Sequence, residues 1–217
     1  MAELNKIQQL SNVEGFLQAN FVKGYKYIDK AGEVVNYFHK NGEPPKFSMD
    51  LNGLIISEPE DGVESIKISS TAFWAHFSSP DSLERMENFF DKTSGEVIRI
   101  LDIEKLSRLG WRLYFVYECN DEETRDRILK KFAPVNGLKL EDVAYSTECQ
   151  NVGINLRIRK VVKTDKSHLP GLLFDVDLYK QYKEPLVSTS IGVQLEEFKK
   201  NIRSDEFLVI LNSILAE

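Results

Sequence analysis

The spacing of apolar residues changes repeatedly along the chain, and each change marks a different predicted element. Apolar positions every three or four residues predict helices, and apolar positions in every second place predict strands with one buried face. Helical spacing occurs in four stretches, at residues 28–38, 80–101, 121–132 and 194–216. Strand-like runs occupy residues 13–22, 46–57, 64–77, 106–119, 139–150, 151–164 and 172–182.

Turn and capping residues support these assignments. Asn52-Gly53 lies between two apolar runs and predicts a two-residue hairpin turn, because both residues tolerate positive φ. Ser79 is expected to cap a helix whose first position is Pro80. Gly42 is expected to end the first helix, and Ser94-Gly95 to bend or break the second.

The order of these elements predicts an α+β fold with mainly antiparallel sheets and helices packed on one face. Two halves of ferredoxin-like size are expected. Residues 1–119 would form a strand, a helix, a hairpin, a strand, a helix and a strand. Residues 120–217 would form a helix, three strands and a helix. No linker-like composition separates the halves, so they are expected to pack as one unit.

Charge and cysteine content narrow the function classes. The net charge of −6 argues against non-specific binding to nucleic acids or anionic membranes. Two cysteines are too few for a disulfide framework, and no Cys/His group has zinc-site spacing. The N-terminus lacks a secretory pattern, and no apolar run reaches the ~18–20 residues that span a bilayer. A cytoplasmic protein without a cofactor is expected.

Asp175 and Asp177 are two residues apart in LLFDVDLYK and therefore share one face of the predicted strand. Arg157 and Arg159 share the polar face of the preceding strand. If the two strands are neighbours, these arginines face the aspartates, and each cross-strand pair contributes roughly 0.2–1 kcal/mol. A solvated salt-bridge ladder is the favoured interpretation.

The first alternative is a metal site. Two carboxylates about 7 Å apart on one face could share a divalent ion with a third ligand. Asp175 and Asp177 would then support phosphodiester hydrolysis, as in a nuclease. Lys180 points to the opposite face from Asp177, and arginines across from the carboxylates would compete with the metal.

The second alternative is nucleic-acid binding. The basic residues that would carry it are Arg157, Arg159, Lys160, Lys163 and Lys166, with Asp165 as the one acid among them. A phosphate-rich partner could follow this strand and loop, and Tyr179 or Tyr182 could supply a stacking surface. Because basic clusters are only an electrostatic footprint, a solvated face is favoured over a nucleic-acid site.

Nucleophilic catalysis has no signature in the chain. Cys119 and Cys149 are not paired by spacing with any of the three histidines, and neither a GxSxG nor a Walker-type loop occurs. The absence of a catalytic constellation favours a non-enzymatic protein.

Two short stretches resemble a known family. One is Arg108-Leu109-Gly110-Trp111-Arg112-Leu113-Tyr114 in a predicted strand, and the other is Asp175-Val176-Asp177 before the last predicted helix. Together they resemble a sporadically distributed family of uncharacterised bacterial proteins with an RLGxRY-type strand and a DxD-type strand. The resemblance implies a bacterial source and this order of elements, and it implies no catalytic residue.

These observations favour a cytoplasmic module that binds another macromolecule. A protein partner is expected, either a different protein or a second copy in a homodimer, because edge strands of antiparallel sheets accept additional strands. Nucleic acid is a less favoured partner, and a membrane partner is not expected.

Overall fold

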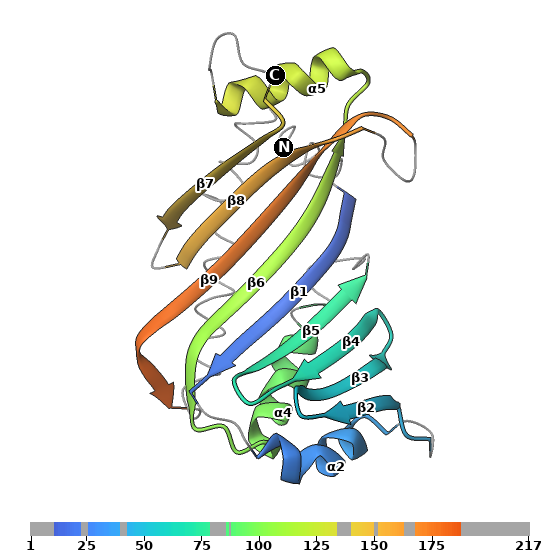
Figure 1. Ribbon diagram of the computed structural model, residues 1–217, viewed down its shortest axis with the longest axis vertical. Helices are drawn as coiled ribbons and strands as arrows, with labels where there is room; N and C mark the ends of the chain where they lie inside the picture. The colour runs from blue at the N-terminus through green and yellow to red at the C-terminus, as the bar shows by residue number, and fades with distance from the viewer. Residues whose placement is uncertain are drawn as a thin grey trace. The chain divides into compact units, whose positions relative to one another are not determined.

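The computed structural model describes residues 11–22, 26–39, 43–78, 86, 88–133, 140–149, 152–162 and 168–187. These residues form mainly antiparallel strands with few helices, so the α+β class is confirmed (Figure 1). They divide into two compact units, one built on Glu14–Trp111 and the other on Arg112–Leu178. The predicted division between residues 119 and 120 stays a prediction.

The Glu14–Trp111 unit contains most of the first half of the chain. Its strands are hydrogen-bonded in the order β2-β3-β4-β5-β1-β6. Their bounds are β1 Ser11–Phe21, β2 Lys46–Asp50, β3 Gly53–Glu60, β4 Val63–Ile68, β5 Ala72–Ser78 and β6 Lys105–Glu118. The helices are α2 Tyr27–Tyr37 and α4 Gly95–Ile100, with a π-helical segment at Phe90–Ser94 directly before α4.

The predicted hairpin at residues 46–57 is present as β2 and β3, but its turn lies one residue earlier than expected. Asp50 pairs with Gly53, so the loop residues are Leu51 and Asn52. The Asp50 carboxylate accepts hydrogen bonds from the backbone N–H of Asn52 at 2.7 Å and of Gly53 at 3.1 Å. An aspartate side chain that holds its own turn in this way stabilises the position of the loop.

The single strand predicted for residues 64–77 is wrong. The chain reverses there between β4 and β5, which pair antiparallel, with Ile68 opposite Phe73. Ser69 forms the turn, since its hydroxyl accepts the backbone N–H of Thr71 at 3.3 Å and of Ala72 at 3.2 Å. Serine side chains stabilise such turns. The buried positions shift at this turn from Ile66 and Ile68 to Phe73 and Ala75, so the period of two is broken there.

The second predicted helix is described only in part. Residues 79–85 and 87 lie outside the described residues, as does Gly42. Met86 and Phe89 are buried as expected. The predicted irregularity at Ser94-Gly95 coincides with the change from π-helical to α-helical geometry.

One face of this sheet is apolar and forms the core of the unit. The strand register places opposite one another the pairs Leu54/Ile68, Ile56/Ile66, Ile66/Ala75, Ile68/Phe73, Ala19/Phe73 and Leu17/Ala75. All of these side chains are buried. Phe77 continues the face and meets Phe89 edge-on, with ring centroids 5.2 Å apart. Helix α2 contacts β3 and α4, so its buried Val34 and Val35 belong to the same core.

The Arg112–Leu178 unit has strands in the order β6-β9-β8-β7. The three strands predicted in the second half are confirmed as β7 Asp142–Cys149, β8 Val152–Val161 and β9 Gly171–Val187. Strand β9 lies between β6 and β8, although β7 and β8 precede it in the chain. The core face carries Ile154, Leu156, Ile158, Leu172, Phe174 and Val176.

Helix α5, Glu122–Phe132, contacts β7 and the buried Phe174 of β9. Phe132 lies 6.5 Å from Phe174 and 6.3 Å from Tyr145, measured between ring centroids. Asp121 caps the helix, because its carboxylate accepts the backbone N–H of Thr124 at 2.6 Å. The helix predicted at residues 121–132 is therefore confirmed, and Asp121 is the cap that the structure adds.

The helix predicted at residues 194–216 lies outside the described residues. Within the part of the chain that the structure describes, no helix is long and apolar enough to cross a membrane.

Candidate functional site

The two aspartates lie on the face of the Arg112–Leu178 sheet that is opposite its core. Side chains alternate along β9, so Phe174 and Val176 point into the core while Asp175 and Asp177 point away from it. Neighbouring strands contribute further polar side chains to this face. We call it the polar face and define it by Arg112, Asp142, Ser146, Asn155, Arg157, Arg159, Asp175 and Asp177.

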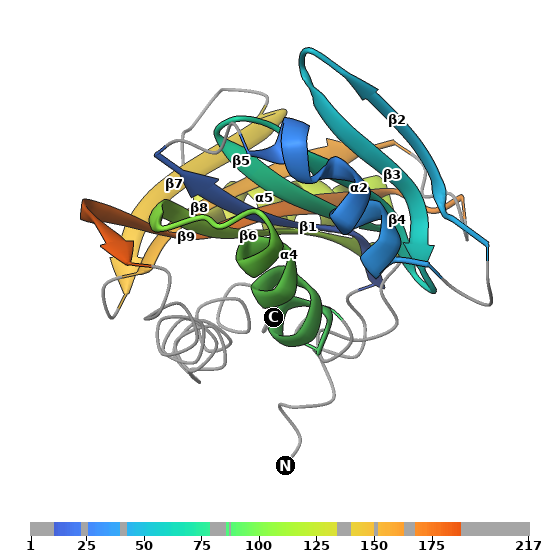
Figure 2. The same cartoon turned by 90° about the horizontal axis from the view of Figure 1, so that it is seen from below.

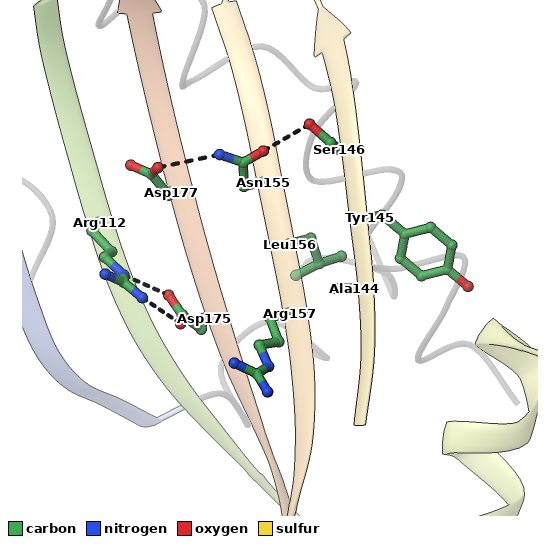
Figure 3. Close-up of a pocket in the computed structure, with 9 residues that line it drawn as sticks. All are labelled: Arg112, Ala144, Tyr145, Ser146, Asn155, Leu156, Arg157, Asp175 and Asp177. Atoms are coloured by element: carbon green, nitrogen blue, oxygen red, sulfur yellow. Dashed lines mark hydrogen bonds and ion pairs between the residues drawn. The ribbon is translucent and has the colours of Figure 1, made fainter. Parts of the chain in front are cut away.

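A pocket of about 460 Å³ opens on the polar face. Its lining comes from all four strands and consists of Arg112, Ala144, Tyr145, Ser146, Asn155, Leu156, Arg157, Asp175 and Asp177 (Figure 3). The lining therefore contains two arginines, two aspartates and several neutral polar groups.

Arg112 and Asp175 form a two-pronged ion pair between β6 and β9. Arg112 Nε and Nη2 each donate to a separate oxygen of Asp175 at 2.8 Å (Figure 3). The hydrogen bonds with Asp175 raise the pKa of the Arg112 guanidinium, although burial acts to lower it. The side chain of Asp175 is 8% exposed and that of Arg112 is 50% exposed. One charged partner, Arg112, therefore binds both oxygens of the buried Asp175 carboxylate.

Asp177 belongs to a chain of hydrogen bonds that crosses three strands. Asn155 Nδ2 donates to Asp177 Oδ2 at 3.3 Å, and Ser146 Oγ donates to Asn155 Oδ1 at 2.7 Å. The amide of Asn155 thus donates on one side and accepts on the other, which defines its orientation. Figure 3 shows this chain beside the Arg112–Asp175 pair.

The arginines of β8 have different partners from those expected. Strands β8 and β9 are neighbours as predicted. Arg157, however, forms an ion pair with Asp142 of β7, on the side of β8 away from β9. Its Nε lies 3.1 Å from Asp142 Oδ2. The Nε of Arg159 is buried and finds no acceptor within the described part of the chain. The ion pair of Asp175 comes instead from β6, because β9 is inserted between β6 and β8.

The basic run of residues 157–166 is divided by strand alternation. Lys160 points to the core face, where its Nζ lies 3.0 Å from Asp126 Oδ1 of α5 and its side chain is 8% exposed. Burial acts to raise the pKa of Asp126, but hydrogen bonds from Lys160 and Arg125 outweigh it and lower the pKa overall. Lys163 and Lys166 lie outside the described residues. Of the five predicted binding residues, the structure therefore places Arg157 and Arg159 on one face.

Among the residues that the structure describes, no cluster of three or more His, Cys, Asp or Glu side chains is arranged to hold a metal ion. A cation at Asp175 would also have to displace the two hydrogen bonds from Arg112.

Cys119 is buried, and burial raises the pKa of its thiol to about 11. A thiol with this pKa is almost entirely protonated at neutral pH and is a poor nucleophile. The side chain of Cys149 lies outside the described residues.

The sequence patterns missed two contacts. The sequence placed Arg112 in a predicted strand but not beside Asp175, since the order of strands in the sheet does not follow from their order in the chain. His76 lies between two carboxylates, 2.6 Å from Glu14 and 3.0 Å from Glu64. The turn at Ser69 brings Glu64 beside His76, and this turn was not predicted.

A second feature is the exposed edge of the Glu14–Trp111 sheet. Strand β2 ends the strand order of the described residues, and all five of its residues are exposed (Figure 2). Phe47 is 56% exposed and Met49 is 41% exposed. Leu51, in the turn that follows, is 94% exposed. We call Lys46–Leu51 the β2 edge.

No family model matches the chain, and no curated protein is similar enough to it to count as a relative.

Proposed function

We propose that this chain is a non-enzymatic cytoplasmic module that binds a protein partner, another protein or a second copy of itself, through the β2 edge. The observation that carries the proposal is an outermost strand that is exposed throughout and presents two large apolar side chains, Phe47 and Met49. We include in this proposal the bacterial source that the resemblance implies.

The physical argument concerns unpaired backbone and apolar surface. An edge strand presents N–H and C=O groups that a further strand can pair with, and proteins usually protect such edges with charges, proline or bulges. Within the β2 edge, strand β2 has charged residues at its two ends, Lys46 and Asp50, and none between them. A partner strand would gain backbone hydrogen bonds and would cover Phe47 and Met49.

The polar face supports a structural rather than a catalytic role. Asp175 is held by Arg112, Asp177 by Asn155, and Arg157 by Asp142. Opposite charges paired across strands help to define the strand register. Helices packed on one face of the sheets, as the sequence predicts, would leave the other face and the edges for contacts with partners.

The two alternative functions gain less support. A phosphodiesterase would need the Asp175 carboxylate for a metal, and that carboxylate is already bound by a guanidinium. A nucleic-acid surface would need unneutralised cations, whereas Arg157 and Lys160 each have an acidic partner.

Co-purification tests the proposal. A tagged chain is produced in bacterial cells together with an untagged copy, and every protein retained with it is identified. We expect a specific protein to be retained with the wild type and lost with Phe47→Lys. Val162→Lys is the matched control, because Val162 is 71% exposed and lies outside the β2 edge. Retention that is unchanged by Phe47→Lys would contradict the proposal, as would a metal-stimulated hydrolytic activity.

A further inference from the structure

We infer that the partner of the β2 edge is a second copy of the same strand, paired antiparallel about a two-fold axis at Ser48. This inference rests on the proposed function and adds the partner and the register. Its basis is that the sequence of β2, Lys46-Phe-Ser-Met-Asp50, is complementary to itself when reversed.

The register follows from the position of the axis. With Ser48 opposite Ser48 of the second copy, Phe47 lies opposite Met49 and Lys46 lies opposite Asp50. A two-fold axis repeats each of these contacts, as in other interfaces that use the same patch on both subunits. Opposite charges then meet at both ends of the paired segment, and apolar side chains meet on either side of its centre.

The same register continues the apolar face of the sheet. Phe47 pairs with Ile56 and Met49 with Leu54 across the hairpin, and residues opposite one another point to the same face. Ile56 and Leu54 are both fully buried, while Phe47 and Met49 are exposed at the border. Antiparallel pairing would bring the Phe47 and Met49 side chains of both copies together in one apolar cluster.

Other pairings of the same strands lose these contacts. A parallel arrangement in register places Lys46 opposite Lys46 and Asp50 opposite Asp50, and like charges directly opposite are destabilising. An antiparallel shift by two residues along one strand places Lys46 opposite either Ser48 or Asn52. Among these arrangements, the one centred on Ser48 alone matches both charges.

Asp50 remains available as an anion in this arrangement. Hydrogen bonds from the backbone N–H of Asn52 lower the pKa of the Asp50 carboxyl, and the nearby charge of Lys67 contributes in the same direction. Asp50 therefore keeps its negative charge at neutral pH while it holds the turn.

Site-specific disulfide formation tests the register. Directly opposite residues of antiparallel strands have Cα atoms about 4.5–5.5 Å apart, which lies within the range of a disulfide. In a Cys119→Ser, Cys149→Ser background, Ser48→Cys is expected to form a covalent dimer under mild oxidation. Lys46→Cys is the matched control on the same exposed strand. Its two copies would lie about 14 Å apart, four residues away along the strands.

We expect Ser48→Cys to cross-link at least tenfold faster than Lys46→Cys. Equal rates, or faster cross-linking of Lys46→Cys, would overturn the register. Thermal melts of the reduced variants verify that both are folded.

Sedimentation of the full chain tests the dimer itself. The wild type and Val162→Lys are expected to dimerise with increasing concentration, and Phe47→Lys to dimerise at least tenfold more weakly. A wild type that stays monomeric at high micromolar concentration would overturn the inference. If that monomer still retains a different protein in a Phe47-dependent manner, the proposed function stands and only the second copy is wrong. If it retains nothing, both fail.

Discussion

Arg112 binds both carboxylate oxygens of Asp175 across two neighbouring strands, with both hydrogen bonds at 2.8 Å. This contact distinguishes between a metal site and a strand-linking ion pair at Asp175. A carboxylate that is 8% exposed and bound on both oxygens is suited to linking strands rather than to binding a metal. The guanidinium also lies over the ring of Tyr114, with its central carbon 5.3 Å from the ring centroid.

Arg112→Ala is expected to lower the free energy of unfolding by about 2–3 kcal/mol. Breaking a buried ion pair costs about 3–5 kcal/mol, because one charge is left without a partner, and the half-exposed Arg112 places this case below that range. Urea denaturation followed by circular dichroism measures the change. Arg157→Ala is the matched control. Its pair with Asp142 is exposed on both sides, so a loss below about 1 kcal/mol is expected.

A double-mutant cycle separates the pair from the packing of its side chains. Arg112→Met combined with Asp175→Leu should cost less than the sum of the two single changes, with an interaction energy of about 1 kcal/mol or more. Additive effects would show that Arg112 and Asp175 do not stabilise each other.

Divalent cations should leave the melting temperature unchanged. A true site occupied at one hundred times its Kd would stabilise the folded state by about 2.7 kcal/mol. Since Arg112 already occupies both oxygens of Asp175, we expect no shift with millimolar Mg²⁺ or Mn²⁺. Asp177→Ala should melt identically with and without metal. A metal-dependent rise that Asp177→Ala abolishes would restore the phosphodiesterase alternative.

Local patterns were sufficient where one face of an element is buried. The alternation of Phe174 and Val176 with Asp175 and Asp177 predicted which face of β9 is polar, and the helical spacing of apolar residues at 121–132 predicted α5. These predictions depend on neighbours within a few positions in the chain. They hold because burial of one face determines the period of the apolar residues.

The partners of the polar residues could not be predicted in the same way. Neither Arg112 nor Asp175 reveals that β9 inserts between β6 and β8, because strand order depends on how the whole sheet assembles. The turn at Ser69 was missed for a different reason. The buried positions change from even numbers, Ile66 and Ile68, to odd numbers, Phe73 and Ala75, but no glycine or proline between them marks a turn. The reversal depends on one serine side chain that binds two backbone N–H groups.

Gly53→Ala should destabilise the Glu14–Trp111 unit by about 2 kcal/mol or more. Gly53 has a φ of 151°, which residues with a Cβ rarely adopt, and an added Cβ would lie 2.3 Å from the backbone oxygen of Ile68. The matched control is Gly32→Ala in α2, where nothing lies within 4 Å of the added Cβ. That change should stabilise the protein by about 0.5–1 kcal/mol, since alanine favours helices. Chemical denaturation of both variants checks the opposite signs. An unchanged stability of Gly53→Ala would contradict the close approach of β3 to β4.

Cys119 should react slowly with iodoacetamide while the protein is folded. Burial raises the pKa of its thiol from an ordinary value near 9 to about 11, and only the thiolate reacts. At pH 8 this shift alone reduces the thiolate fraction roughly a hundredfold relative to an unfolded cysteine. Alkylation is followed by mass spectrometry in a Cys149→Ser background, so that one cysteine is observed. Rapid alkylation of the folded protein at pH 8 would show that the thiol is accessible and ionised.

The same shift predicts how Cys119 affects stability at alkaline pH. A group whose folded pKa is raised stabilises the fold fully below its unfolded pKa, and this contribution is lost as the pH rises through the folded pKa. The stability difference between the wild type and Cys119→Ala should therefore be constant up to about pH 9 and should shrink between pH 9 and 11. Chemical denaturation at a series of pH values measures it, and the subtraction removes the effect of titratable groups that do not interact with Cys119. A difference that grows with pH would mean that the folded state favours the thiolate, which is incompatible with a thiol whose pKa is raised by burial.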